Sequence, residues 1–141
     1  MTTFKIKSIL TLENHFKRIG NLNFEDLDNA VSNMNIEIEK HVTEGDEFTV
    51  FLTVTVDQKL EDTILVEGSI ITAGVFQMEG TRDETALENF TKINGPAILF
   101  PFAREYFQST SIKCLLPPII LPPVNFVEKD RAEREKAGNT N

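Results

Sequence analysis

The chain has 141 residues, of which 40% are hydrophobic and 26% are charged, and this balance is typical of one ordered globular domain. Its formal net charge of −8 argues against nucleic acid and anionic membranes as partners, because both attract clustered Lys and Arg. The single cysteine, Cys114, cannot form an internal disulfide, the N-terminus lacks an export signal, and no apolar run approaches a membrane span. We therefore expect a cytoplasmic protein that is not inserted into a membrane.

The first half of the sequence alternates apolar and polar residues, and this alternation predicts β-strands. Residues 4–12 form the first run. Its expected inner face consists of Phe4, Ile6, Leu10 and Leu12. A connection over residues 13–32 leads to a second run at 34–39. A connection of this length is usually functional or a crossover.

Two further strands are expected after a turn at residues 44–47. Residues 48–56 show the clearest alternation in the chain, and a longer run extends from residue 63 to about residue 78. Gly68 and Gly74 suggest bends or bulges in this last run. Because short turns join the last three runs, we expect an antiparallel meander that the first strand reaches through the long connection.

Helices are expected in the second half. Residues 81–84 have the spacing of a capping box, which places the start of a helix near Arg82 and buries Leu87. The Asn-Gly pair at 94–95 is expected to end this helix, and Pro96 suits the first position of the next one.

The second expected helix has a broad apolar face at helical spacing. This face consists of Ile98, Leu99, Phe102, Ala103, Tyr106 and Phe107. Pro101 removes an intrahelical hydrogen bond and is expected to bend the start of the helix. Taken alone, such a face belongs more often to a protein's own core than to an interface.

The loop that follows the second helix is unusually apolar and contains two Pro-Pro pairs between Leu115 and Phe126. Loops normally lie on the surface and are polar, because water satisfies their backbone groups. This loop is therefore expected either to pack on its own core or to line a site for other apolar chains. Residues 128–141 are almost wholly polar, and we expect a domain over 1–127 followed by a charged tail that frays after Ala137.

This half contains two distinctive short runs, ILFPFARE at residues 98–105 and LPPVNF at residues 121–126. They resemble the signature sequences ILFPYARE and LAPVNF of SecB, the bacterial export-chaperone family. A weaker resemblance covers Phe4 to Phe126. It implies an α+β fold, in which a four-stranded antiparallel sheet carries a long helix and the helix-connecting loop on one face. It also implies a homotetramer, a dimer of dimers, that holds unfolded precursors in hydrophobic grooves without ATP and delivers them to the translocation motor SecA.

The resemblance further implies which residues serve each contact. The client groove is expected to consist of Phe16, Phe24, Leu27, Met34, Ile36, Ile38, Ile119, Leu121, Val124 and Phe126. The subunit interface is expected at Phe102, Tyr106 and Phe107. The contact with SecA is expected on the outer face of the sheet, at Glu37, Glu39, Glu67 and Ser69.

The sequence departs from the family pattern at two places. Residues 127–136 are almost wholly charged where the family has an amphipathic second helix, so a hydrophobic lid over the groove is not expected. Ser69 stands where the family presents an acid, so we expect SecA to bind more weakly than it binds a typical family member, with Glu67 as the nearest remaining acid.

The sequence contains no catalytic constellation above background. His15 and His41 have no partner at metal-ligand spacing, Cys114 has no neighbouring histidine, and neither common phosphate-binding glycine motif occurs. We therefore expect no enzyme, metal or cofactor. The alternative functions are a SecB-like chaperone dedicated to one client, such as an antitoxin, and a module that oligomerises through its Phe-rich helix without any client groove.

Overall fold

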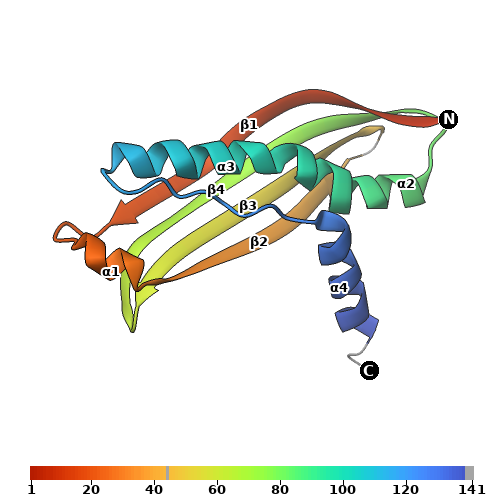
Figure 1. Ribbon diagram of the computed structural model, residues 1–141. Coiled ribbons are helices and arrows are strands. Elements are labelled where there is room, and N and C mark those ends of the chain that lie inside the picture. Colours follow the sequence, from red (N-terminus) through yellow and green to blue (C-terminus); the bar gives the residue numbers. More distant parts are fainter. Residues whose placement is uncertain (44, 139–141) are drawn as a thin grey trace.

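The computed structural model describes residues 1–43 and 45–138, and within them four strands form a single antiparallel sheet in the order β1-β4-β3-β2. The strands are β1 (Thr2–Arg18), β2 (Val31–Val42), β3 (Glu47–Leu60) and β4 (Thr63–Gly80). A long helix and the loop after it cover one face of the sheet (Figure 1). This arrangement confirms the predicted α+β class. Glu44, the first residue of the predicted turn at 44–47, lies outside the described residues.

The centre of the sheet follows the alternation seen in the sequence. On β3, the side chains on the helix-covered side are buried, and those on the opposite side are partly exposed. The buried residues are Phe48, Val50, Leu52, Val54 and Val56. They face Ile70 and Phe76 of β4 within one continuous core. Burying each such side chain stabilises the fold by roughly 1.5–3 kcal/mol relative to leaving it exposed.

Strand β1 differs from its predicted pattern. It extends to Arg18, and its pairing with β4 shifts register between Ile6 and Ser8 and again between Thr11 and Glu13. Each such bulge adds one residue and reverses the alternation beyond it. Leu10 follows the first bulge and Leu12 lies in the second, so these two predicted inner residues are 41% and 52% exposed, whereas Ile9 and Phe16 pack against the core. Phe4 packs against the core as predicted, and Ile6, which precedes the first bulge, is 49% exposed.

The helical layer is more continuous than predicted. It runs through α2 (Glu84–Asn89), the π-helical turn η1 (Phe90–Asn94) and α3 (Gly95–Lys113) without the expected break at Asn94–Gly95. Gly95 lies against β3, where an added Cβ would stand 3.1 Å from a methyl carbon of Val50. This glycine allows close packing and does not end the helix. Asp83 caps α2 by accepting hydrogen bonds from the backbone N–H groups of Thr85 and Ala86, so the helix starts two residues later than predicted.

Helix α3 lies directly on β4 because two glycines of that strand leave room for it. A Cβ at Gly68 would stand 3.0 Å from the Phe107 ring, and one at Gly74 would stand 2.9 Å from Leu99. The residues skipped in the pairing of β4 are Lys7 and Leu12 of β1 and Leu65 of β4 itself, so no bulge forms at Gly68 or Gly74. Their function is close approach of the helix, and Leu99, Ala103 and Phe107 are fully buried there.

The segment after α3 returns across the sheet as an extended loop and ends in α4 (Phe126–Gly138), which turns away from the sheet (Figure 1). Within α4, ion pairs join Lys129 to Glu133 and Asp130 to Arg134. The residues buried in α4 are Phe126 and Asp130. Of the residues predicted to fray after Ala137, Gly138 is the last residue of α4, and residues 139–141 lie outside the described residues. The short helix α1 (Phe24–Asp28) interrupts the connection from β1 to β2.

Candidate functional site

The Pro-rich loop divides its apolar side chains between the core and the surface. Leu116, Ile119 and Leu121 are buried, whereas Leu115 is 79% exposed and Ile120 is 68% exposed. The loop is held in place by Ser111 of α3, whose hydroxyl oxygen accepts a hydrogen bond of 2.9 Å from the backbone N–H of Ile119. The same hydroxyl donates to the Gln108 carbonyl. The loop is therefore anchored to the helix at one buried point.

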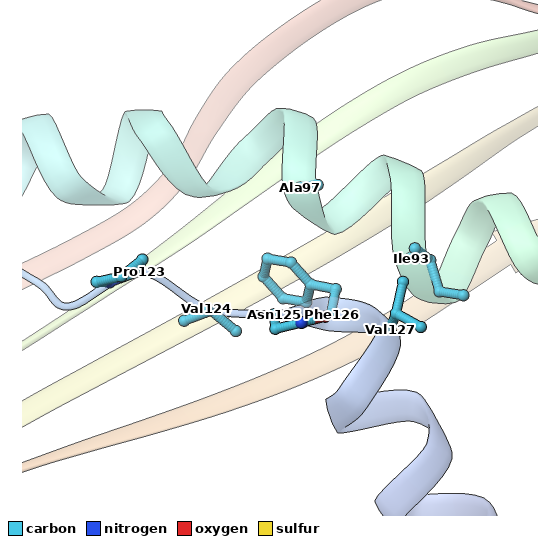
Figure 2. Close-up of a pocket in the computed structure, with 7 residues that line it drawn as sticks. All are labelled: Ile93, Ala97, Pro123, Val124, Asn125, Phe126 and Val127. Atoms are coloured by element: carbon cyan, nitrogen blue, oxygen red, sulfur yellow. The ribbon is translucent and has the colours of Figure 1, made fainter.

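Two apolar hollows adjoin this loop in the described part of the chain. The first has a volume of about 290 Å³ and separates the loop from β2 and β3. It is lined by Ser32, Asn33, Met34, Val56, Ile119, Ile120, Leu121 and Pro122. The second has a volume of about 490 Å³ and lies where the loop meets η1, α3 and α4. It is lined by Ile93, Ala97, Pro123, Val124, Asn125, Phe126 and Val127 (Figure 2).

Phe126 forms the floor of the second hollow. Its ring points from the loop toward α3 (Figure 2), where it meets the Phe100 ring edge to face at a centroid distance of 6.0 Å. The Arg104 guanidinium lies 5.2 Å from the centroid of the same Phe100 ring. Phe126 is 4% exposed, so it serves mainly as core, while Val124 and the exposed Val127 offer surface to a ligand.

The structure brings some predicted groove residues together and separates others. Met34, Ile119 and Leu121 line the first hollow, and Val124 and Phe126 line the second. Ile36 and Ile38 continue the Met34 row along β2, half-buried on the helix-covered side. Phe16, in contrast, lies on β1 at the other edge of the sheet. Its ring packs against Phe107 at a centroid distance of 6.4 Å.

The connection between β1 and β2 contributes less to this surface than predicted. Phe24 is exposed on α1 and Leu27 packs against the core, and neither residue lines the two hollows. The prediction missed Ile93 and Ala97, which form the helical wall of the second hollow. Sequence spacing could not reveal them, because their proximity to Val124 depends on how the loop returns beneath the helix.

The predicted interface residues of α3 differ in exposure. Phe107 is fully buried within the chain, so of the three predicted residues only Phe102 and Tyr106 offer surface to a partner. Phe102 is 48% exposed and, with Pro101 and Glu105, lines an apolar hollow of about 360 Å³. Burial raises the pKa of Tyr106 above its usual value, and its phenol donates a hydrogen bond of 3.4 Å to Oδ1 of Asn14 on β1.

The four residues predicted to contact SecA share the face of the sheet that the helices leave open. Glu37 pairs with Thr53 and Glu39 with Phe51, and both acids are exposed. Ser69 and Glu67 follow on β4. A carboxylate oxygen of Glu67 lies 3.8 Å from the His15 imidazole, so this acid is weakly paired, while Glu37 and Glu39 have no ion-pair partner within the described residues.

No group of three or more His, Cys, Asp or Glu side chains that could hold a metal ion occurs among the described residues. Across residues 1–43 and 45–138, no helix combines the length and apolarity needed to span a membrane.

The class of protein follows first from the fold. A solved SecB-like chaperone of Mycobacterium tuberculosis, in complex with a ChAD peptide from an antitoxin, superimposes with a TM-score of 0.74. The two chains share 16% sequence identity, and the superposition covers 86% of this chain and 91% of the Mycobacterium chaperone chain. At this identity the likeness establishes the fold, which is that of SecB-like proteins.

The family follows from the sequence matches. The family model described as preprotein translocase subunit SecB matches residues 6–135, and the chain therefore belongs to the SecB family. The protein-export protein SecB of Chromobacterium violaceum is 37% identical over 95 residues, which cover 65% of this chain and 63% of that relative. The SecB protein of Aromatoleum aromaticum is 35% identical over 111 residues, covering 77% of this chain and 69% of the relative. The SecB protein of Neisseria meningitidis serogroup B is 32% identical over 111 residues, covering 72% of this chain and 75% of the relative.

Proposed function

We propose that this protein is an ATP-independent chaperone that binds unfolded precursor polypeptides along its Pro-rich loop and delivers them to SecA. The observation that carries the proposal is the pair of apolar hollows beside a loop that holds Ile120 in solvent. The curated relatives are named protein-export proteins, which supports the same function. The match spans 63% of the Chromobacterium relative's length.

Binding in such hollows requires no sequence code. Apolar surface removed from water contributes about 25 cal/mol per Å², so any client side chain of suitable size gains free energy there. Each hollow alone would bind weakly, but several weak sites on one unfolded chain reinforce one another through effective concentration. Folded proteins keep their apolar side chains inside and would not bind.

The test uses two matched substitutions in the same loop. Ile120→Glu places a charge in the first hollow, where desolvation of the carboxylate opposes client binding. Leu115→Glu places the same charge at a residue that is also exposed but lines neither hollow. Purified protein should slow aggregation of a chemically denatured precursor equally well with and without ATP, and Ile120→Glu alone should weaken this effect.

Circular dichroism of both variants completes the experiment. Both positions are exposed, so both variants should fold. A folded Ile120→Glu variant that holds the precursor as well as the original protein does would contradict the loop assignment. Failure of the unmodified protein to slow aggregation would contradict the chaperone function itself and favour a module that only oligomerises.

The proposed assembly is a homotetramer, a dimer of dimers. Its support is the exposed side of α3, where Phe102 and the hollow at Pro101 and Glu105 present apolar surface that a second copy would bury. Static light scattering over a range of protein concentrations checks this. A monomer at all concentrations would exclude the assembly. A stable dimer would support the interface within each dimer and exclude the interface between the two dimers.

The proposed contact with SecA uses the open face of the sheet, where Glu37, Glu39 and Glu67 supply negative charge near Ser69. Exposed charges contribute mainly to association rate and to salt-sensitive affinity. We expect titration calorimetry with SecA to give weak binding that weakens further as salt rises. Tight, salt-insensitive binding would place the contact elsewhere. Absence of binding would favour a chaperone dedicated to one client.

A further inference from the structure

The part of the Pro-rich loop between Ile119 and Asn125 is held by hydrogen bonds at its two ends. At the first end, the backbone N–H of Ile119 donates to the buried hydroxyl of Ser111. At the second end, Asn125 caps α4, because its side-chain oxygen accepts a hydrogen bond of 3.1 Å from the backbone N–H of Glu128. Residues 120–124 between these ends form no hydrogen bond with the described part of the chain. The backbone of this segment is therefore fixed from its two ends.

The segment between the two anchors is stiff and is packed at its middle. Pro122 and Pro123 have fixed φ angles and no backbone N–H, and consecutive prolines favour the extended polyproline II conformation. Leu121, which is 4% exposed, packs in the core between the anchors. Because the middle of the segment is packed, release of one end should displace the residues nearest to that end and leave the other end in place.

Each anchor adjoins a different hollow. Ile119 and the three residues after it line the first hollow, and Asn125 lies among the residues that line the second (Figure 2). Ser111 is fully buried and lines neither hollow, so it can act on a ligand only through the loop. A binding surface that is already ordered loses less conformational entropy when a ligand binds, and this pre-organisation increases affinity.

We propose, on the basis of the chaperone function above, that Ser111 and Asn125 are positioning residues, and that each sets the affinity of the hollow beside it. Ser111 acts through Ile119, whose backbone it holds against α3. Asn125 acts through the first turn of α4, which carries Phe126 and Val127 into the second hollow. The two halves of the loop are therefore ordered independently of each other.

The first test reads the order of each half in the protein without client. The chain has no tryptophan, so a single introduced tryptophan reports on one place. Ile120→Trp puts this reporter on the first hollow and Val127→Trp puts it on the second, and both positions are exposed. Addition of Ser111→Ala should lower the tryptophan fluorescence anisotropy of the Ile120→Trp protein and leave that of the Val127→Trp protein unchanged. Addition of Asn125→Ala should have the reverse effect.

The second test measures affinity in the protein without reporters, using a fluorescein-labelled, unstructured peptide rich in Leu and Val. Ser111→Ala should weaken peptide binding about threefold to tenfold, as expected when one or two side chains must be ordered by the ligand. The matched control is Ile70→Val, which removes one buried methyl group from β4, a strand that lines neither hollow. This control should destabilise the fold slightly and leave the peptide affinity unchanged.

Urea denaturation establishes that each variant is folded under the conditions of the assay. An unchanged affinity in folded Ser111→Ala, or an equal loss of affinity in Ile70→Val, would overturn the proposal. An equal fall in the anisotropy of both reporters would also overturn it, because the loop would then move as one piece. Asn125 is exposed, so Asn125→Ala tests the independence of the two halves even if Ser111→Ala proves too unstable to assay.

These outcomes are distinguishable from failure of the chaperone function. If the unmodified protein slows aggregation and Ser111→Ala binds the peptide equally well, client binding stands and the positioning role is wrong. If the unmodified protein neither slows aggregation nor binds the peptide, the chaperone function is wrong, and the proposed effect on affinity falls with it. The two reporters are read without client, so they still decide whether the anchors order the loop independently.

Discussion

Helix α3 and the loop that follows it lie on the same face of the sheet and are both rich in apolar residues, yet they use these residues differently. Leu99, Ala103 and Phe107 of α3 are fully buried against β3 and β4. The loop buries only some of its apolar side chains and holds Leu115 and Ile120 in solvent. The helix therefore supplies stability, whereas the loop supplies apolar surface for binding at little cost to the core.

The largest expected effect tests the helix. Phe107→Ala removes a fully buried ring that contacts Phe16 and Tyr106, and it should lower the free energy of unfolding by about 3–5 kcal/mol. Phe102→Ala, on the exposed side of the same helix, is the matched control and should cost much less. Urea denaturation followed by circular dichroism measures both. Equal losses would show that the outer side of α3 is also buried in the assembled protein.

A smaller effect is expected at the joint between helix and loop. Ser111→Ala removes the acceptor for the buried N–H of Ile119 and should cost about 1–3 kcal/mol. Ser109→Ala removes a hydroxyl that donates a long hydrogen bond of 3.4 Å to the Tyr106 carbonyl and should cost less. If hydrogen exchange shows no faster exchange at Ile119 in Ser111→Ala, the loop is held mainly by its apolar side chains.

An increase in stability is expected beneath α3. The Thr72 hydroxyl is buried and has no hydrogen-bond partner among the described residues, so Thr72→Val should raise the free energy of unfolding by about 1 kcal/mol. Thr53→Val, at a partly exposed position on the open face of β3, is the control and should change little. Destabilisation by Thr72→Val would mean that the hydroxyl has a bound partner.

The smallest effect on stability is expected in the loop, where the effect on binding is largest. Ile120→Glu should change the free energy of unfolding by no more than about 0.5 kcal/mol, because the side chain is already in solvent. Urea denaturation of the same sample that is used in the aggregation assay measures this. A large loss of stability would show that Ile120 is buried in the assembly and that loop and helix do not differ as described.

The sequence was sufficient to predict elements whose local pattern matches their environment. Strands β3 and β4 could be predicted because the alternation of residues 48–56 coincides with burial on one face. The inner face of β1 could not be predicted, because its bulges reverse the alternation and depend on the pairing of β1 with β4. The same holds at Gly95, which resembles a helix end in sequence but fills a close contact with Val50.

The candidate site was predictable to a similar extent. The Pro-rich loop and the Met34 row were identified from apolar runs and from the resemblance to SecB, and they meet at the first hollow. Ile93 and Ala97 could not be identified from the sequence, because they line the second hollow only through contact with residues 123–127, about thirty residues further along the chain. Phe107 looked equivalent to Phe102 in the sequence, since helical periodicity alone does not show which part of a broad apolar face meets the sheet.

The pairing of β1 with β4 also constrains how the protein is made. Thr2 lies opposite Gly80 and Arg18 opposite Val66, so the first strand to be synthesised finds its partner only after most of the sheet has been translated. Strands β2, β3 and β4 are consecutive and can pair as each emerges. Contacts between distant parts of a chain form slowly, because loop closure costs entropy before the contact is gained. On the ribosome, the nascent protein therefore carries an unpaired β1 whose Phe4, Ile9 and Phe16 have not yet reached the core, and for that period it has the same features as the chains that it is proposed to protect.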